Sequence, residues 1–345
     1  MNIALLAPLW KKVPPEKYGG TELIVANLAN GLTQLGHEVT TFACAGSKMD
    51  GNLIEAIPDE MYNLIGGFKW DAIQSYEFLA YYKLGRRIND FDIVHNHMGM
   101  HPLALASFSQ VPFLTTLHSS LPPDFQHLAE EFANENFSSI SLAQRKLAPN
   151  LNYVANVYHG IDIDSFVPNF NPGSYLFFIG TLSHNKGIDI AVRAAHQLNL
   201  PLIIAGEIRE SDREFLNKEV FPLVDGEKIK FIGEVSHQEK ASLYAGAKAL
   251  LFPSRWNEAF GLVVAESLAC GTPVVALNNG SPSEIIEDKK TGYIVNTEEE
   301  FMDAIKNISK ISRELCRAEA VSRFSLIEMA KRYVEVYKKL IEKKI

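Results

Sequence analysis

The sequence predicts an α/β protein made of two doubly wound domains with parallel sheets. With 345 residues, the chain is long enough for two domains of ordinary size. Residues 2–7 have the pattern of a buried strand, followed by a helix that ends near Leu35 and a second strand at 39–43. The same order starts again with a strand at 175–179 and a helix after Gly187. Both halves are therefore expected to be doubly wound.

The composition is that of an ordinary globular protein, with 47% apolar and 21% charged residues. The net charge is −8 and no long basic run occurs, so nucleic acid is not an expected partner. No apolar stretch reaches the ~18 residues of a membrane-spanning helix, and residues 3–8 are too short for a secretory signal. Cys44, Cys270 and Cys316 are odd in number and widely spaced, which favours reduced, buried thiols. We therefore expect a cytoplasmic protein.

The first half is expected to contain further parallel strands at 92–95, 113–117 and 152–157, with a short helix at 102–109. His95 and His97 lie at the end of the first of these strands, and His118 ends the second. Ligands of open α/β sheets bind outside the carboxyl ends of the strands, so these histidines are candidates for a site. A single histidine is more often a structural residue, and that alternative stays open for His95 and His97.

Residues 46–90 have little regular pattern but contain a cluster of aromatic residues. The cluster and the two arginines that follow it are Trp70, Tyr76, Phe78, Tyr81, Tyr82, Arg86 and Arg87. A helix of this composition would either pack on its own sheet or touch a lipid surface. The small number of basic residues favours packing, and a peripheral membrane contact is the alternative.

Residues 168–173 are rich in Pro, Asn and Gly and have no apolar periodicity, which is typical of a hinge. We therefore expect an N-terminal domain at 1–168 and a C-terminal domain at 169–324. The strands of the second domain are expected at 175–179, 202–205, 229–233, 247–252, 273–276 and 291–295. The last segment, 325–345, has the pattern of an amphipathic helix with lysines on its polar face.

Residues 252–266 are the most informative stretch, because they connect a buried strand to a helix expected at 262–269. Gly261 lies where this helix begins, so only backbone would separate the helix N-terminus from a ligand. Free amides and the positive end of the helix dipole favour a phosphate at such a place. Glu258 in the loop and Glu266 in the helix would repel a phosphate. Sugar hydroxyls, which donate to carboxylates, are therefore their expected partners.

This stretch resembles the paired-glutamate signature of glycosyltransferase family 4, whose members are retaining enzymes of the GT-B fold. The match runs from Glu258 through Ala-Phe-Gly-Leu-Val to Glu266 and continues to residue 275. The resemblance implies two Rossmann-like domains facing each other across a cleft. It also implies that Glu258 lies by the donor sugar and Glu266 holds the nucleotide ribose. The backbone amides of Phe260, Gly261 and Leu262 would approach the sugar or the diphosphate.

Other parts of the chain match further features of this family. Gly19 and Gly20 match a donor-phosphate loop after the first strand, although a plain tight turn would also explain the pair. His118 matches a strand-end histidine that faces the donor sugar, and Gly233 precedes the turn that lies against the nucleobase. The terminal helix would cross back onto the first domain. A helix that closes the second domain is the alternative.

Of the two cations that usually bind the donor diphosphate in this family, only one is present. The arginine expected directly after Gly180 is replaced by Thr181, whereas the lysine five residues later is present as Lys186. A charge-assisted hydrogen bond contributes about 1.5–3 kcal/mol, so the replacement would weaken donor binding roughly tenfold or more. Arg255 and Arg209 are candidates to substitute for the missing arginine.

The resemblance implies a glycosyltransferase of the hexosyltransferase type with a UDP-, GDP- or ADP-sugar as donor and no cofactor. No Asp-x-Asp motif lies at a strand end, so we expect a metal-independent enzyme in which Lys186 and backbone amides stabilise the leaving diphosphate. Glu258, His118 and Lys186 are the expected catalytic residues. The acceptor, a glycan, a glycolipid or a small molecule, would bind the first domain between residues 46 and 150.

Two other functions stay open at this point. Thr181 is compatible with a nucleotide-sugar-binding protein that has little catalytic activity. A disaccharide phosphorylase would use the same fold and the same cations.

Overall fold

The computed structural model describes residues 1–16, 19–67, 69–119, 126–146, 148–171 and 173–344. These residues form two compact units, and each is described here by itself. Unit 1 comprises Met1–Ile161 with Ser325–Ile345, and unit 2 comprises Asp162–Phe324. The sequence placed the domain boundary after residue 168, whereas the units divide after Ile161. Pro172 of the expected hinge and Ile345 at the end of the expected terminal helix lie outside the described residues.

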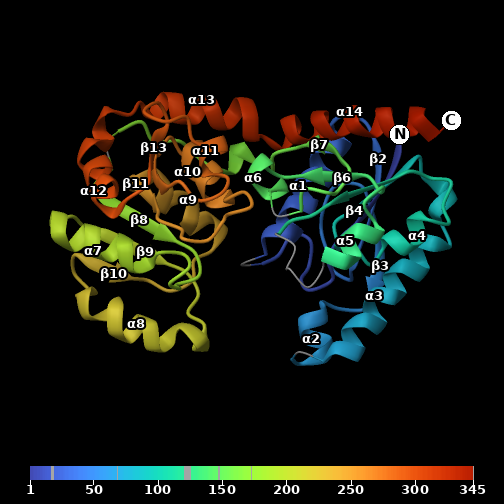
Figure 1. Ribbon diagram of the computed structural model, residues 1–345, viewed down its shortest axis with the longest axis horizontal. Helices are drawn as coiled ribbons and strands as arrows, with labels where there is room; N and C mark the ends of the chain where they lie inside the picture. Colours follow the sequence, from blue (N-terminus) through green and yellow to red (C-terminus); the bar gives the residue numbers. More distant parts are fainter. Residues whose placement is uncertain (17–18, 68, 120–125, 147, 172, 345) are drawn as a thin grey trace. The chain divides into compact units, whose positions relative to one another are not determined.

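Unit 1 contains a parallel sheet with seven described strands, in the order β3-β2-β1-β4-β5-β6-β7. Figure 1 shows the helices of this unit around the sheet. The strands are β1 (Asn2–Leu6), β2 (Glu38–Cys44), β3 (Asn52–Ile57), β4 (Ile93–Asn96), β5 (Phe113–Thr116), β6 (Phe137–Ser139) and β7 (Tyr153–Asn156). The sheet is covered on both faces, so Ile3, Leu5 and Leu6 of β1 are fully buried. The strand order reverses between β1 and β4, which places a topological switch point at their carboxyl ends. β3 and β6 were not expected from the sequence.

The helices of unit 1 are α1 (Gly20–Gln34), α2 (Met61–Ile65), α3 (Trp70–Gly85), α4 (Leu103–Ala106), α5 (Gln126–Glu131), α6 (Leu142–Arg145), α14 (Leu326–Lys344) and the 3-10 helix η1 (Ile88–Asp90). Helix α3 packs on the core of this unit through Ile73, Ala80 and Leu84. Its aromatic residues divide, because Tyr76 and Tyr81 are partly buried against the core while Phe78 and Tyr82 are exposed.

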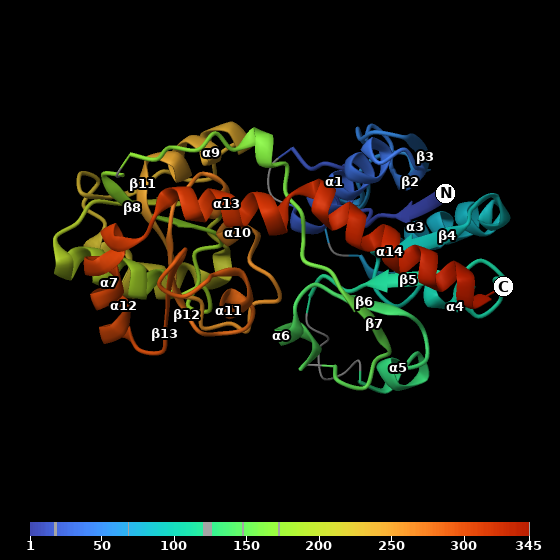
Figure 2. The same ribbon diagram turned by 90° about the horizontal axis from the view of Figure 1, so that it is seen from above.

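Helix α14 belongs to unit 1 and lies beside α1 (Figure 2). A side-chain carbon on Gly31 of α1 would lie 2.8 Å from the carbonyl oxygen of Leu326, so the absence of a side chain allows the two helices to approach closely. The apolar face of α14 also reaches the sheet, where the hydroxyl of Tyr337 lies 2.7 Å from Nδ1 of His95. Tyr333 lies 3.0 Å from Oγ1 of Thr116. The segment predicted as an amphipathic helix therefore covers the sheet of unit 1.

Unit 2 contains a second parallel sheet with six described strands, in the order β10-β9-β8-β11-β12-β13. The strands are β8 (Tyr175–Ile179), β9 (Leu202–Ala205), β10 (Ile229–Phe231), β11 (Ala247–Phe252), β12 (Val274–Leu277) and β13 (Gly292–Val295). The α-helices are α7 (Ile188–Leu198), α8 (Arg213–Glu219), α9 (His237–Gly246), α10 (Leu262–Ala269), α11 (Pro282–Ile285), α12 (Glu298–Asn307) and α13 (Arg313–Phe324). The 3-10 helices are η3 (Ile163–Ser165), η4 (Glu210–Asp212), η5 (Phe221–Leu223) and η6 (Ile308–Lys310). The order reverses between β8 and β11, so the switch point of unit 2 lies at their carboxyl ends.

The three cysteines are free and buried, as the sequence predicted. In the part of the chain that the structure describes, no helix has the length and apolar character needed to cross a membrane.

Candidate functional site

Two loops of unit 2 meet at the switch point, one after β8 and the other after β11. The carbonyl oxygen of Asn185 in the first loop accepts hydrogen bonds from the backbone nitrogens of Arg255 at 2.8 Å and Trp256 at 3.2 Å. Nη1 of Arg255 donates to the carbonyl oxygen of His184 at 2.8 Å. The second loop therefore fixes the position of the residues that surround Lys186.

Lys186 and Glu258 are in direct contact within this arrangement. Nζ of Lys186 donates to Oε1 of Glu258, and Oγ of Ser254 donates to the same oxygen at 3.0 Å. Glu258 is only 9% exposed, whereas the side chain of Lys186 is 35% exposed. The structure thus brings together two of the residues that the sequence assigned to catalysis. The side chain of Lys186 is therefore only partly enclosed by this contact.

The loop that carries Glu258 is also held by the segment after β12. Glu258 forms an isolated parallel bridge with Gly280, and the backbone nitrogen of Ser281 donates to the carbonyl oxygen of Glu258 at 3.0 Å. Gly280 has φ +86°, and a side-chain carbon there would lie 2.4 Å from that carbonyl oxygen. Glycine is therefore required for this close approach.

Helix α10 begins beside Glu258 with a glycine N-cap. Gly261 has φ +84°, in the left-handed region where glycine is unstrained. The first backbone N–H groups of a helix have no acceptor within the helix. The N–H groups of residues 261–263 can therefore donate hydrogen bonds to a ligand at the N-terminus of α10. Gly261 and Leu262 are half-buried, while Phe260 is buried and packs edge to face on Phe324 at 5.9 Å between ring centroids. This geometry suits the binding of an anionic or polar ligand at the helix N-terminus.

Glu266 lies one to two turns into α10 and is 2% exposed. Its Oε2 accepts a hydrogen bond from the hydroxyl of Tyr244 at 2.9 Å, and its Oε1 accepts one from Nζ of Lys240 at 2.6 Å. Burial, together with the neighbouring charge of Glu266, raises the pKa of Tyr244 well above its usual value. The phenol therefore stays protonated and keeps donating to Glu266. Each carboxylate oxygen retains a second lone pair for a further donor.

The two arginines expected as substitutes for the missing cation have other partners. Arg255 forms two hydrogen bonds to the carboxylate of Asp189, at 2.8 and 2.7 Å, and Asp189 is buried. The hydrogen bonds and charge of Asp189 raise the pKa of Arg255, although its partial burial opposes this shift. Arg209 is largely exposed and lies 3.5 Å from Glu207. Thr181 is half-buried in the loop after β8, and Gly233 follows β10 with φ +78°.

Unit 1 has a cavity of about 380 Å³ at the carboxyl ends of β1, β4 and β5. Its lining includes Thr21 and Glu22, near the start of α1, and His118, which follows β5 in the chain. Gly20 is the first residue of α1 and Gly19 precedes it. A side-chain carbon on Gly19 would lie 2.8 Å from the ring of Pro15, so packing alone explains a glycine there. The cavity occupies the switch point where ligands of such sheets bind.

His118 belongs to a row of four buried or half-buried histidines. Its Nε2 lies 2.8 Å from Nδ1 of His97, and its ring stacks on His159 at 5.1 Å between centroids. The ring centroids of His95 and His97 lie 4.0 Å apart. Burial lowers the pKa of His118 to about 3 and lowers the pKa of the other three histidines well below the usual value. The row is therefore uncharged at neutral pH.

The contact between His97 and His118 requires that one of the two nitrogens carries the proton. In a neutral imidazole the other ring nitrogen then has the opposite role. Among the described residues, neither Nε2 of His97 nor Nδ1 of His118 has a hydrogen-bond partner. The pair therefore has one unused donor and one unused acceptor in either tautomeric arrangement. His95, by contrast, is satisfied by Tyr337 and Thr116, which supports its structural role.

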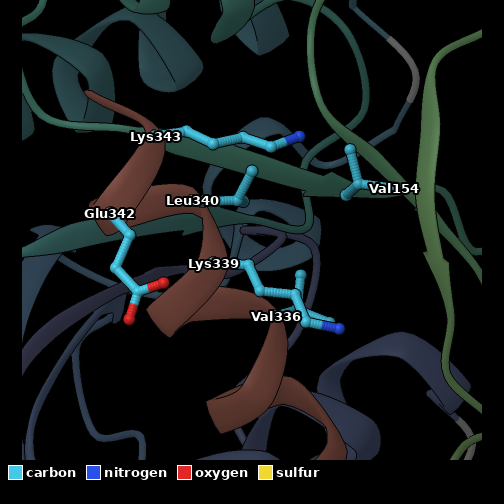
Figure 3. A pocket seen from close by; sticks show the side chains of 6 residues that line it. All are labelled: Val154, Val336, Lys339, Leu340, Glu342 and Lys343. Atoms are coloured by element: carbon cyan, nitrogen blue, oxygen red, sulfur yellow. The ribbon is translucent and has the colours of Figure 1, made fainter. Parts of the chain in front are cut away.

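A second cavity of about 270 Å³ lies between β7 and α14, also in unit 1. Figure 3 shows the side chains that line it, which are Val154, Val336, Lys339, Leu340, Glu342 and Lys343. None of the residues predicted to form a site lines this cavity. It is a surface hollow beside the terminal helix.

Sequence reasoning missed several residues that position the predicted ones. Ser254 and Asp189 hold the loops of Glu258 and Lys186, while Lys240 and Tyr244 hold Glu266. Lys240 and Tyr244 are four residues apart on α9 and therefore share a face of that helix. This spacing carries no information about a partner on α10. Within the described residues, no group of three or more His, Cys, Asp or Glu side chains is arranged to hold a metal ion.

Comparison with known proteins gives matches over most of the chain. The family model for glycosyl transferases group 1 matches residues 161–321, and the model for glycosyltransferase family 4 matches residues 18–162. An uncharacterised glycosyltransferase of Methanocaldococcus jannaschii is 27% identical over 316 residues, which cover 84% of this chain and 85% of the relative. The chain belongs to the family 4, group 1 glycosyltransferases, as the sequence signature indicated.

Solved structures support the same fold. Sucrose-phosphate synthase from Thermosynechococcus elongatus superposes with a TM-score of 0.80 and 18% identity, covering 99% of this chain and 100% of that one. The Anabaena protein HepE in complex with UDP and glucose superposes with a TM-score of 0.74 and 18% identity, with the same coverage. The expected GT-B fold with two parallel-sheet α/β domains is confirmed, and the protein is a glycosyltransferase.

Proposed function

We propose that the protein transfers a sugar from a nucleotide-diphosphate sugar to an acceptor hydroxyl, with retention of the anomeric configuration and without a metal ion. The observation that carries this proposal is the contact between Lys186 and Glu258 beside the N-terminus of α10. This region of unit 2 brings together the partly exposed, cationic side chain of Lys186, the first backbone amides of α10 and the buried carboxylate of Glu258. These are the groups that a diphosphate and a sugar require.

Unit 2 is the proposed donor-binding unit. The diphosphate would lie against the amides of Gly261 and Leu262 and take Nζ of Lys186 as its cation. Glu266 would accept hydrogen bonds from the ribose hydroxyls, since each of its oxygens has a lone pair left. Thr181 and Gly233 would lie along the diphosphate and the nucleobase. The UDP complex of HepE, which has the same fold, makes UDP the first nucleotide to test.

In the proposed reaction, the bond between the anomeric carbon and the diphosphate oxygen breaks and leaves an oxocarbenium-like sugar. The acceptor hydroxyl attacks from the face on which the diphosphate departs, and its proton passes to a diphosphate oxygen. Lys186 and the helix amides stabilise the negative charge on the leaving group, which is electrostatic preorganisation. Glu258 orients the sugar. By the family resemblance, Gly19 and Gly20 of unit 1 are proposed to approach the donor phosphates, and His118 is proposed to face the donor sugar.

The experiment that tests this function is a donor screen with the purified chain. UDP-glucose, UDP-galactose, GDP-mannose and ADP-glucose are incubated with simple sugars, with and without EDTA, and nucleotide release is measured. Transfer that EDTA changes by less than about twofold supports the proposal, and the anomeric coupling constant of the product reports retention. An inverted product or a strict metal requirement would contradict it.

A nucleotide-sugar-binding protein with little catalysis is the second candidate, because Thr181 stands where a diphosphate-binding arginine is expected and Arg255 is held by Asp189. Calorimetry with UDP alongside the donor screen separates the two functions. Tight binding of UDP without turnover of any donor would favour the binding protein.

A further inference from the structure

The cavity at the switch point of unit 1 has a wall that suits one chemical class of acceptor. Its volume of about 380 Å³ lies within the range of small-molecule sites, roughly 300–1,000 Å³. Two carboxylates line it, those of Glu22 and Glu77, and none of its described lining residues is a lysine or an arginine. An aromatic ring, Trp10, forms another part of the wall.

Glu77 on α3 is the carboxylate most available to a ligand. Its Oε2 accepts a hydrogen bond from the hydroxyl of Tyr81 at 3.2 Å and lies 3.5 Å from Nδ1 of His101. Both contacts use Oε2, so Oε1 has no hydrogen-bond donor among the described residues. The side chain of Glu77 is 16% exposed and that of His101 is 48% exposed. The two residues therefore form a fixed acceptor and an adjacent imidazole at the wall of the cavity.

Two further observations indicate a ligand with hydroxyl groups. Glu22 is 6% exposed at the start of α1, and the nearby cation, Lys11, does not line the cavity. His97, which is 3% exposed, also lines the cavity and has an unpartnered Nε2 among the described residues. Carboxylates accept from hydroxyls, and an aromatic ring packs on the apolar face of a sugar ring. Among the described lining residues, a phosphate group would instead meet two carboxylates and no lysine or arginine side chain.

We propose that this cavity binds the acceptor as an uncharged, polyhydroxylated ring, that Glu77 and His101 determine this specificity, and that acceptors phosphorylated on that ring are excluded. The inference rests on the proposed glycosyl transfer, because it takes the cavity as the acceptor side of that reaction. It goes further by naming the acceptor class and the two residues that select it.

Saturation-transfer NMR on the full chain in the presence of UDP tests this specificity without requiring turnover. The probes are the methyl glycosides of glucose, galactose and mannose and the 6-phosphates of the same sugars. We expect saturation of at least one methyl glycoside and of none of the phosphates. The signal should fall at least fivefold in Glu77→Gln and in His101→Ala, and it should persist in the control Glu38→Gln. Glu38 is exposed at the opposite, amino-terminal end of β2.

His101→Ala alters a half-exposed side chain, so it keeps the test decisive should Glu77→Gln fold poorly. Equal signals from phosphorylated and uncharged sugars would overturn the proposal. The absence of a signal from all three methyl glycosides, or signals that survive in Glu77→Gln and His101→Ala, would do the same. Donor turnover by the unmodified protein, measured separately, tests the proposed function, so the two failures are distinguishable.

Discussion

Lys186 and Glu258, which are 72 positions apart in the chain, form an ion pair at the switch point of unit 2. Lys186 lies in the loop after β8 and Glu258 in the loop after β11, and these strands are neighbours in the sheet. A salt bridge between a partly exposed and a buried group contributes little net stability by itself. We propose that this ion pair serves function instead. A diphosphate can bind the ammonium group of Lys186 while the carboxylate of Glu258 stays oriented toward a sugar.

Replacement of Glu258 by glutamine tests the proposed role of this carboxylate. Gln keeps the size and a hydrogen-bond acceptor for Ser254 but removes the charge, so we expect kcat to fall about a hundredfold or more. The melting temperature should change little. Steady-state kinetics with the best donor measures the effect, and Glu299→Gln, at an exposed position on α12 of the same unit, is the control. Transfer at the rate of the unmodified enzyme would show that Glu258 has no part in catalysis.

Replacement of Thr181 by arginine restores the cation that the family usually has after the first strand of this domain. The guanidinium of Arg255 is bound to Asp189, so it does not already supply the missing positive charge. An arginine at position 181 should therefore add a new contact to the diphosphate. We expect UDP to bind about tenfold more tightly, consistent with one added charge-assisted hydrogen bond. Calorimetry measures the change, with Ser211→Arg as an exposed control. Equal gains in both variants would mean that the added charge acts only at long range.

Replacement of Glu266 by glutamine tests the proposed ribose contact. The carboxylate accepts from Tyr244 and Lys240, and we expect it to accept from the ribose hydroxyls as well. The unmodified protein should therefore prefer UDP to 2′-deoxy-UDP roughly tenfold, and the variant should bind both nearly equally. Glu299→Gln, an exposed position on α12, should keep the preference. A preference of the same size in Glu266→Gln would place the ribose elsewhere.

The buried histidines predict a loss of stability in mild acid. The pKa of His118 is lowered to about 3 by burial, against about 6.5 in the unfolded chain. The unfolded state therefore binds more protons below pH 6.5, and the free energy of unfolding decreases as the pH falls from 6.5 toward 3. For His118 alone the decrease between pH 7 and pH 5 is up to about 2 kcal/mol.

Urea unfolding at pH 7 and pH 5 measures this dependence. His118→Asn removes one titrating group, so the difference between the two pH values should become smaller than in the unmodified protein. His127→Asn changes a largely exposed histidine and should leave the difference unchanged. The same pH dependence in all three proteins would exclude His118 as a source of the effect.

The sequence predicted the elements whose signals are local. The strand at 175–179, the strand at 247–252 and the helix at 262–269 were placed at their observed bounds, because apolar runs end at Gly and Pro residues. β3 and β6 were missed for a physical reason: β6 has only three residues, and β3 is half-exposed without clean alternation. Such strands are defined by their neighbours in the sheet rather than by their own residues.

The residues of the candidate site also fall into a group that the sequence predicted and a group that it did not. Glu258, Lys186 and Glu266 were identified from motifs, whereas their partners were not. Asp189, Ser254 and Tyr244 contact them only because the sheet brings distant loops together, and their spacing in the chain is uninformative. The expectation that Arg255 could substitute for the missing arginine assumed a free guanidinium. Its pairing with Asp189 depends on a contact between residues 66 positions apart.

The most direct test of the central claim is the affinity for UDP of the unmodified protein and of Lys186→Met, measured by calorimetry. Methionine keeps the length of the side chain and removes the charge, and Lys230→Met is an exposed control in the same unit. The account predicts that Lys186→Met binds UDP at least tenfold more weakly while the control binds as before. Equal affinities in all three proteins would contradict it.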